Sequence, residues 1–245
     1  LVLRSPNKVV DDLERLQQLG YVQASLTYDI AELGEPYWQE LFSQMRQRNV
    51  QISLYNEFFQ LPSAAFIDAM ADVVVPEHSC VALSPLVGNA SVRRLNGKHF
   101  SNDQFFDVLD LLQRKHMYLF VYFSLNLPGE TNATFKETLS LAEDTYYFYP
   151  NSLLKIINSV HTMDPLAPMN VRASAYGINS TMTTFMDFYH YCEQTMDQTP
   201  DARNGLYRGF DLVDPSARSL QMMADEWDQL RSGKEACWWP LPPGW

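Results

Sequence analysis

The sequence predicts an α/β fold in which parallel strands alternate with helices, and three observations lead to this prediction. Apolar residues recur with helical and strand periods in turn over about the first 160 residues of the 245-residue chain. Each pair of a helix and a strand occupies roughly 25 to 40 residues, which suits right-handed crossovers between parallel strands. Each predicted strand also runs into a polar loop that contains glycine or proline. Because such loops share one edge of a parallel sheet, we expect them to line one site.

The first part of this series begins and ends its helices at residues suited to those positions. Asn7 is a favourable N-cap residue, and Gly20 is favourable just after a helix end. Pro36 suits the first turn of the next helix, and Asn49 suits its end. The predicted elements are a helix from Asn7 to Leu19, a strand from Tyr21 to Tyr28, a helix from Pro36 to Asn49, a strand from Val50 to Tyr55 and a helix from Pro62 to Asp72.

The second part of the series repeats the pattern and has two pairs of residues at capping-box spacing. Ser101 and Gln104 precede an apolar stripe, and Thr134 and Glu137 have the same spacing. The predicted elements are a strand from Ser79 to Leu83, a helix from Asn102 to Lys115, a strand from Met117 to Leu125, a helix from about Thr134 and a strand from Ser152 to Asn158.

Both ends of the series suggest how the chain is organised. The series opens with a helix, whereas a barrel or a doubly wound sheet begins with a strand, so we predict that the first strand is missing. After Pro168 the pattern changes to an aromatic-rich helix at 183–196, a helix at 214–231 and the irregular ending CWWPLPPGW. We therefore predict one domain at 1–168 and a mostly helical C-terminal extension at 169–245.

Charge, hydropathy and cysteine content exclude several classes of protein. The net charge of −11 would repel a phosphate backbone, so we expect no nucleic-acid partner. No run of about 18 apolar residues predicts a membrane span, and no targeting segment is visible. The three cysteines, Cys80, Cys192 and Cys237, have no metal-ligand spacing and are odd in number. They indicate a reducing compartment, so we expect a cytoplasmic protein without a metal site on this chain.

Catalytic residues remain unassigned, because the sequence contains no nucleophile elbow, P-loop, zinc-protease helix or dinucleotide fingerprint. Glu57 is the first candidate binding residue. It lies at a strand end among aromatic residues, where burying an unpaired carboxylate is costly, so it should meet a cation, an amine or hydroxyl groups of a ligand. The alternative is a helix cap or an ion pair with Arg46 or Arg48.

The segment SPLVGNASVRRLNGKHFS, residues 84–101, is a second candidate. Ser84 ends a predicted strand, and Arg93, Arg94 and Lys98 follow it closely. A hydroxyl backed by basic side chains suits a carboxylate or another anion. The alternative is a solvated helix face.

The third candidate is SLNLPGET, residues 124–131. Its Pro-Gly pair predicts a tight turn in which Gly129 allows a ligand to approach the backbone, and Asn126 offers both a donor and an acceptor. A turn followed by a helix start also explains the proline, glycine and threonine, but it does not explain why Asn126 and Glu130 flank them.

Taken in order, these segments resemble the radical S-adenosylmethionine enzymes, especially their cobalamin-dependent branch. The resemblance covers about residues 4–168. It rests on KVVDDLERLQQLGYVQASLTYD, YNEFF, SPLVGNASVRRLNGKHFS, NLPGET and the proline-rich turn after the last strand. It implies a partial TIM-like barrel with its active site at the carboxyl ends of the strands.

The resemblance also implies the roles of particular residues. Glu57 and Ser84 match positions that hold the ribose or the amino-acid part of S-adenosylmethionine, and Lys98 matches a basic position that pairs with its carboxylate. Residues Asn126, Leu127, Pro128, Gly129 and Glu130 match a loop that lies under the adenosine. The implied cofactors are S-adenosylmethionine, a 4Fe-4S cluster and cobalamin on a missing domain.

The chain departs from the family in two places. It has no C-x-x-x-C-x-x-C segment to hold the cluster, which would have preceded Leu1 on the missing strand, and its Ser84-Pro85 strand end lacks the family's usual Gly-Glu. We expect part of an enzyme that transfers a methyl group to, or carries out a related radical modification of, a peptide or small molecule. As cut, the chain would be inactive and would need the missing N-terminal half or a companion subunit.

Two other hypotheses about the function are possible. The first is a non-catalytic degenerate barrel that binds a peptide or another protein, for which the aromatic helix and the tryptophan-rich tail are the hints. The second is an ordinary TIM-barrel enzyme without a metal, which lacks an evident acid/base or nucleophile set.

Overall fold

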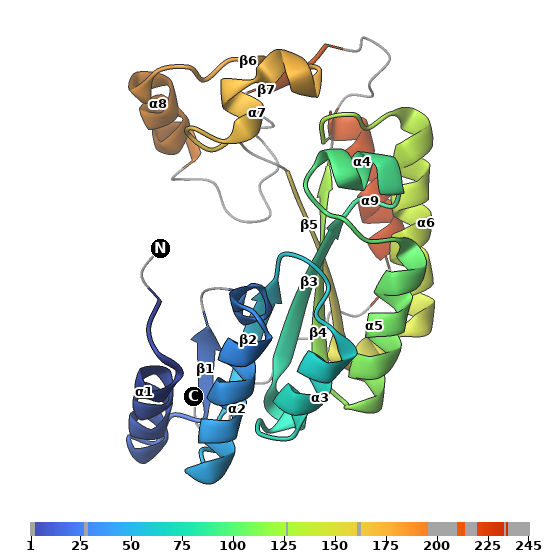
Figure 1. The fold of residues 1–245 in the computed structure, drawn as a ribbon. Helices are drawn as coiled ribbons and strands as arrows, with labels where there is room; N and C mark the ends of the chain where they lie inside the picture. The colour runs from blue at the N-terminus through green and yellow to red at the C-terminus, as the bar shows by residue number, and fades with distance from the viewer. Residues whose placement is uncertain are drawn as a thin grey trace.

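The computed structural model describes residues 3–26, 29–125, 127–160, 163–195, 210–213, 220–232 and 234. Its centre is a parallel sheet of five strands in the order β1-β2-β3-β4-β5, shown in Figure 1. The strands are β1 (Gln23–Leu26), β2 (Ser53–Phe58), β3 (Cys80–Leu86), β4 (Tyr118–Leu125) and β5 (Leu154–Val160). The spatial order follows the sequence order, as in the wall of a barrel, which confirms the predicted parallel α/β fold.

The connecting helices lie along one side of this sheet (Figure 1). Helix α1 (Pro6–Gln18) precedes β1. The helices between the strands are η1 (Ile30–Leu33), α2 (Glu35–Gln47), α3 (Ala64–Ala71), η2 (Pro76–His78), α4 (Ala90–Leu95), α5 (Asn102–Arg114), α6 (Asn132–Phe148) and η3 (Asn151–Leu153). Alternate strand residues, such as Leu54, Val81, Val121 and Ile156, join the helices in the main hydrophobic core. We call this the helix side of the sheet and the opposite side its inner face.

Several predicted helix boundaries are confirmed and two are wrong. Ser101 and Gln104 form the predicted capping box of α5. The N-cap of α1 is Ser5 and not Asn7, because Pro6 provides a helical φ at the first position. The capping box of α6 joins Thr131 and Thr134 and not Thr134 and Glu137.

Strand β3 is longer than predicted and leads into a short helix that periodicity missed. It continues past Ser84 and Pro85 to Leu86, with an irregular register between Leu83 and Leu86. Proline fits this place because the irregularity needs no ladder hydrogen bond there. Helix α4 follows and is capped by Asn89, whose side chain accepts hydrogen bonds from the N–H groups of Ser91 and Val92. With only six residues, α4 is too short to give a periodic signal.

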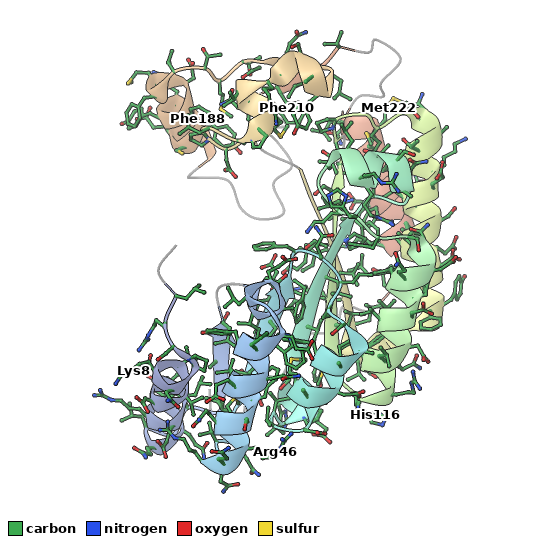
Figure 2. The ribbon with its side chains drawn as sticks, viewed as in Figure 1. Lys8, Arg46, His116, Phe188, Phe210 and Met222 are labelled. Atoms are coloured by element: carbon green, nitrogen blue, oxygen red, sulfur yellow. The ribbon has the colours of Figure 1, made fainter. Side chains whose placement is uncertain are left out.

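The chain beyond β5 forms a second cluster and then returns to the first. The elements are α7 (Pro168–Val171), η4 (Ala173–Tyr176), β6 (Ile178–Ser180), α8 (Phe185–Thr195), β7 (Phe210–Leu212) and α9 (Leu220–Arg231). Strands β6 and β7, which were not predicted, form an antiparallel pair beyond the carboxyl ends of the parallel strands, near Phe188 and Phe210 in Figure 2. Trp227 of α9 is fully buried in the main core and contacts the ring of Phe123, with 5.3 Å between centroids.

The division into 1–168 and 169–245 stays a prediction, although α9 packs on the same sheet as the earlier helices. The predicted cap at residues 214–215 and the ending CWWPLPPGW lie outside the described residues. Among the helices that the structure describes, none is long and apolar enough to cross a membrane.

Candidate functional site

The loops at the carboxyl ends of the strands are fastened to one another by hydrogen bonds. The side chain of Asp29, after β1, accepts a hydrogen bond of 2.7 Å from the N–H of Phe59, after β2. Gln60 in turn donates to the carbonyl of Gly97 (2.8 Å) and accepts from the N–H of His99 (3.0 Å). These bonds cross from one strand's loop to the next, so they build one continuous rim.

The rim continues to the loop after β4. The amide of Asn96, at the end of α4, donates to the carbonyl of Pro128 at 3.0 Å. The buried carboxylate of Glu130 accepts from the Thr138 hydroxyl at 3.3 Å, and that hydroxyl accepts from the N–H of Gly88 at 2.9 Å. Residues from four strand ends therefore hold a fixed arrangement.

Lys98 and Glu57 come together at this rim. Glu57 lies exposed near the end of β2 on the inner face. The Lys98 amine donates to the carbonyl of Phe59 at 2.6 Å and lies 5.7 Å from the centroid of the Phe59 ring. Burial lowers the pKa of the Lys98 amine, while the negative charges of Glu57 and Asp29 oppose that shift. The charges of both carboxylates therefore act on the amine, which is fixed in place by the Phe59 carbonyl.

The predicted alternative partners of Glu57 are occupied elsewhere. Arg46 pairs with Asp72 at 3.4 Å, and Figure 2 places it at the far end of α2 from the rim. Arg48 pairs with Asp11 and Glu14. The predicted alternative, an ion pair of Glu57 with either arginine, is therefore wrong. Glu57 lies on the inner face of the sheet and is exposed.

Asp29 is a rim residue that the sequence analysis did not select. It is 2% exposed and also accepts a hydrogen bond from the N–H of Ala31 (3.0 Å), so it caps η1. Burial raises the pKa of the Asp29 carboxyl, against the effect of the N–H groups that it accepts from. Its place directly after β1, before a short turn of helix, was the available signal.

Arg93 is not available to bind an anion, although the basic cluster of which it is part was predicted to bind one. Its side chain is fully buried, so the solvated-face alternative is also wrong for this residue. The guanidinium donates to the carbonyls of Pro85, Val87 and Phe100 and to the side chain of Asn102. Neighbouring Arg94 is exposed. The two adjacent arginines therefore have opposite environments, and Arg93 stabilises the connection between β3 and α5 through its hydrogen bonds.

The SLNLPGET loop uses most of its side chains for packing. Leu127 is fully buried with Val87 and Val92 in a small cluster. Gly129 is exposed, has φ of +84° and would bring a Cβ to 2.8 Å from the side chain of Leu95. Contacts of this loop with a ligand would therefore come mainly from its backbone. Asn126 lies outside the described residues, and Ser84 lies on the inner face of β3, two residues beyond the partner of Glu57.

Two tyrosines extend this site down the inner face. The hydroxyl groups of Tyr55 and Tyr122 are 3.4 Å apart. Burial raises the pKa of Tyr55, with further contributions from its hydrogen bond to Tyr122 and from the charge of Glu57. Burial likewise raises the pKa of Tyr122, and Glu57 adds to that effect. Both phenols therefore stay protonated and can act as hydrogen-bond donors.

Comparison with solved structures identifies this architecture. The radical S-adenosylmethionine methyltransferase TsrM from Kitasatospora setae, in a structure with cobalamin and a [4Fe-4S] cluster bound, matches with a TM-score of 0.58 at 16% sequence identity. The match covers 74% of this chain and 37% of that chain. The fold is that of part of a radical S-adenosylmethionine enzyme.

Other comparisons add little to this assignment. The coproporphyrinogen III oxidase HemN from Escherichia coli, also a radical S-adenosylmethionine enzyme, matches with a TM-score of 0.46 at 15% identity over 73% of this chain and 48% of that chain. No family model and no curated protein matches the sequence. The similarity to TsrM in three dimensions confirms the partial TIM-like barrel that the resemblance implied.

The described residues suit one of the cofactors that the resemblance implies and not another. Carboxylate, ammonium and backbone groups at the rim suit the polar groups of S-adenosylmethionine. Among the described residues, no three histidine, cysteine or acidic side chains are grouped to hold a metal. Cys80 is buried and Cys192 is exposed, and they lie far apart in the sequence. These residues do not fit an iron–sulfur cluster.

Proposed function

We propose that this chain forms the S-adenosylmethionine-binding wall of a cobalamin-dependent radical S-adenosylmethionine enzyme. The enzyme would transfer a methyl group to, or carry out a related radical modification of, a peptide or a small molecule. The observation that carries the proposal is the hydrogen bond that holds the Lys98 amine on the carbonyl of Phe59, two residues after Glu57, at the carboxyl rim of a barrel wall with this fold. Catalytic residues are not part of the proposal.

The two side chains offer complementary contacts to the methionine part of the cofactor. The Glu57 carboxylate would accept from an ammonium or a hydroxyl group, and the Lys98 ammonium would pair with the carboxylate. The carbonyl of Phe59 fixes the Lys98 amine at 2.6 Å and leaves it further protons to donate. Ser84 and the backbone of Leu127, Pro128, Gly129 and Glu130 would line the ribose and adenine side, together with Asn126.

The remaining parts of the enzyme would lie outside this chain. The chain spans about a third of the length of TsrM, the structure quoted above. The cluster ligands and a cobalamin-binding domain would belong to a preceding segment or to a companion subunit. We place the enzyme in the cytoplasm, because a thiolate-held cluster requires a reducing compartment.

The test is binding of S-adenosylhomocysteine to the protein that contains this chain, reconstituted anaerobically with iron and sulfide. We expect Glu57→Gln and Lys98→Met each to weaken binding by roughly tenfold or more, because each removes a charge-assisted hydrogen bond. Arg94→Met is the matched control, since Arg94 is exposed in the same segment, and it should leave binding within about twofold. Calorimetric titration measures all three.

Two outcomes would contradict the proposal. If wild-type protein fails to bind S-adenosylhomocysteine and shows no visible absorption after reconstitution, the non-catalytic barrel becomes the better interpretation. If both rim variants bind like Arg94→Met, the cofactor does not contact Glu57 and Lys98.

A further inference from the structure

One row of residues crosses the inner face of the sheet and carries opposite charges at its two ends. The register pairs Glu57 with Ala82, Ala82 with Phe120 and Phe120 with Lys155. The row therefore runs from an anion on β2 to a cation on β5. With strands about 4.8 Å apart, the backbone positions of these two residues are separated by about 14 Å.

Aromatic side chains lie in this row and on either side of it. The rings of Tyr55 and Phe120 meet edge to face with centroids 6.3 Å apart, and the hydroxyl of Tyr55 reaches that of Tyr122. These contacts pass from β2 to β4 across β3, where the intervening residues are Cys80 and Ala82, which are both fully buried. A larger residue there would hold the rings apart. We call Tyr55, Phe120 and Tyr122 the aromatic floor.

The aromatic floor differs from the usual interior of a closed barrel. Such interiors are packed with layers of branched aliphatic side chains. Here the three rings are each partly exposed, and they carry two phenolic hydroxyls. A surface of this kind offers flat apolar contact together with hydrogen-bond donors, which suits a planar ring.

The charge on the floor comes from Lys155. Its ammonium lies 5.4 Å from the centroid of the Phe120 ring. A ligand anion placed at this end would meet a cation beside an aromatic face. At the other end it would meet the Glu57 carboxylate together with the Lys98 amine, where the two charges oppose each other and the amine already donates to the Phe59 carbonyl. The row therefore orients a ligand with its anionic group toward β5.

We propose that the aromatic floor is the substrate-binding surface and that it takes a planar aromatic ring bearing a carboxylate or a similar anionic group. The ring lies on Tyr55, Phe120 and Tyr122, and the anionic group pairs with Lys155. This inference rests on the proposed function in one respect: it places the substrate beside the cofactor groups at Glu57. No cofactor contact is needed for the ring to bind.

A ligand titration without S-adenosylmethionine, iron or cobalamin tests the inference. The probes are naphthylacetate, its saturated counterpart decahydronaphthylacetate, and naphthylethanol, which lacks the anion. We expect naphthylacetate to bind to the purified protein that contains this chain roughly tenfold more tightly than either of the other two, because each lacks one of the two contacts. Ligand-observed NMR measures such affinities.

Matched variants locate the binding. Lys155→Met should reduce naphthylacetate affinity to that of naphthylethanol, whereas Lys136→Met, at an exposed position on α6, should change nothing. Tyr122→Phe keeps the ring and should bind within about twofold of wild type. Phe120→Leu should weaken the aromatic probes selectively, and its unfolding curve checks that it folds.

Several results would overturn the inference. Equal binding of the aromatic and the saturated acid would exclude a role for the rings, and equal loss in the Lys155→Met and Lys136→Met variants would mean unspecific charge attraction. Absence of any binding would exclude the floor as a site. Since Glu57→Gln tests cofactor binding separately, loss of that function with naphthylacetate binding intact would refute only the cofactor assignment.

Discussion

Arg93 is the residue on which the connection between β3 and α5 depends most. Its guanidinium donates to three backbone carbonyls and one side chain in a fully buried position. Arg93→Met would leave those acceptors without donors, so we expect a loss of about 3 kcal/mol or more in unfolding free energy. Arg94→Met, on the exposed side of α4, should stay within about 0.5 kcal/mol. Urea unfolding measures both, and equal stabilities would show that the buried hydrogen bonds are dispensable.

Asp29 gives the protein a pH dependence of a particular sign. Because burial raises its pKa above the unfolded value of 3.8, the folded state binds a proton more readily than the unfolded state. Ionisation of Asp29 therefore lowers the unfolding free energy. The loss begins as pH rises through 3.8 and is complete above the folded pKa, and it is absent below pH 3.8.

The prediction is tested on the difference between wild type and Asp29→Asn, measured by urea unfolding from about pH 3 to about pH 7. As pH rises, the unfolding free energy of the wild type should fall relative to that of Asp29→Asn. A shift in the opposite direction would mean that the hydrogen bonds to Asp29, and not its burial, dominate its ionisation.

At the scale of elements, Gly88 sets how closely α6 approaches the end of β3. A Cβ at this position would lie 2.1 Å from the backbone oxygen of Glu137, so α6 would have to move. We expect Gly88→Ala to cost about 2 kcal/mol or more. Gly97→Ala is the control: its φ of +84° strains an alanine, but the added Cβ meets open space. A thermal scan should show the larger loss for Gly88→Ala, and equal losses would mean that α6 yields easily.

Some helices and site residues could be predicted from the sequence, and others could not. Strong apolar stripes and the Ser101–Gln104 box correctly located α5 and its neighbours. The short helix α4 gave no stripe, so the different fates of Arg93 and Arg94 could not be seen. Glu57 and Lys98 were selected from their places in the chain and lie together, whereas Asp29 was missed because its carboxylate binds backbone groups of a distant loop. Long-range hydrogen bonds of this kind leave no local pattern.

For the whole molecule, α9 joins the last described part of the chain to the sheet. Trp227 is fully buried against Phe123 of β4, although about 100 residues separate them. We expect Trp227→Ala to cost about 4 kcal/mol and to speed amide hydrogen exchange in β4. Phe185→Ala, at a ring that is 80% exposed on α8, should change neither. Unchanged exchange in β4 would mean that α9 is a separate appendage.

The chain of hydrogen bonds from Asp29 through Gln60 and Asn96 to Glu130 has a consequence for association at the rim. Loops that must become ordered when a ligand arrives lose conformational entropy at that moment, and the loss weakens affinity. Here folding has already restricted these loops, so a ligand meets a surface in its bound shape. The rim is therefore preorganised, and a ligand should bind there without a conformational change of the loops.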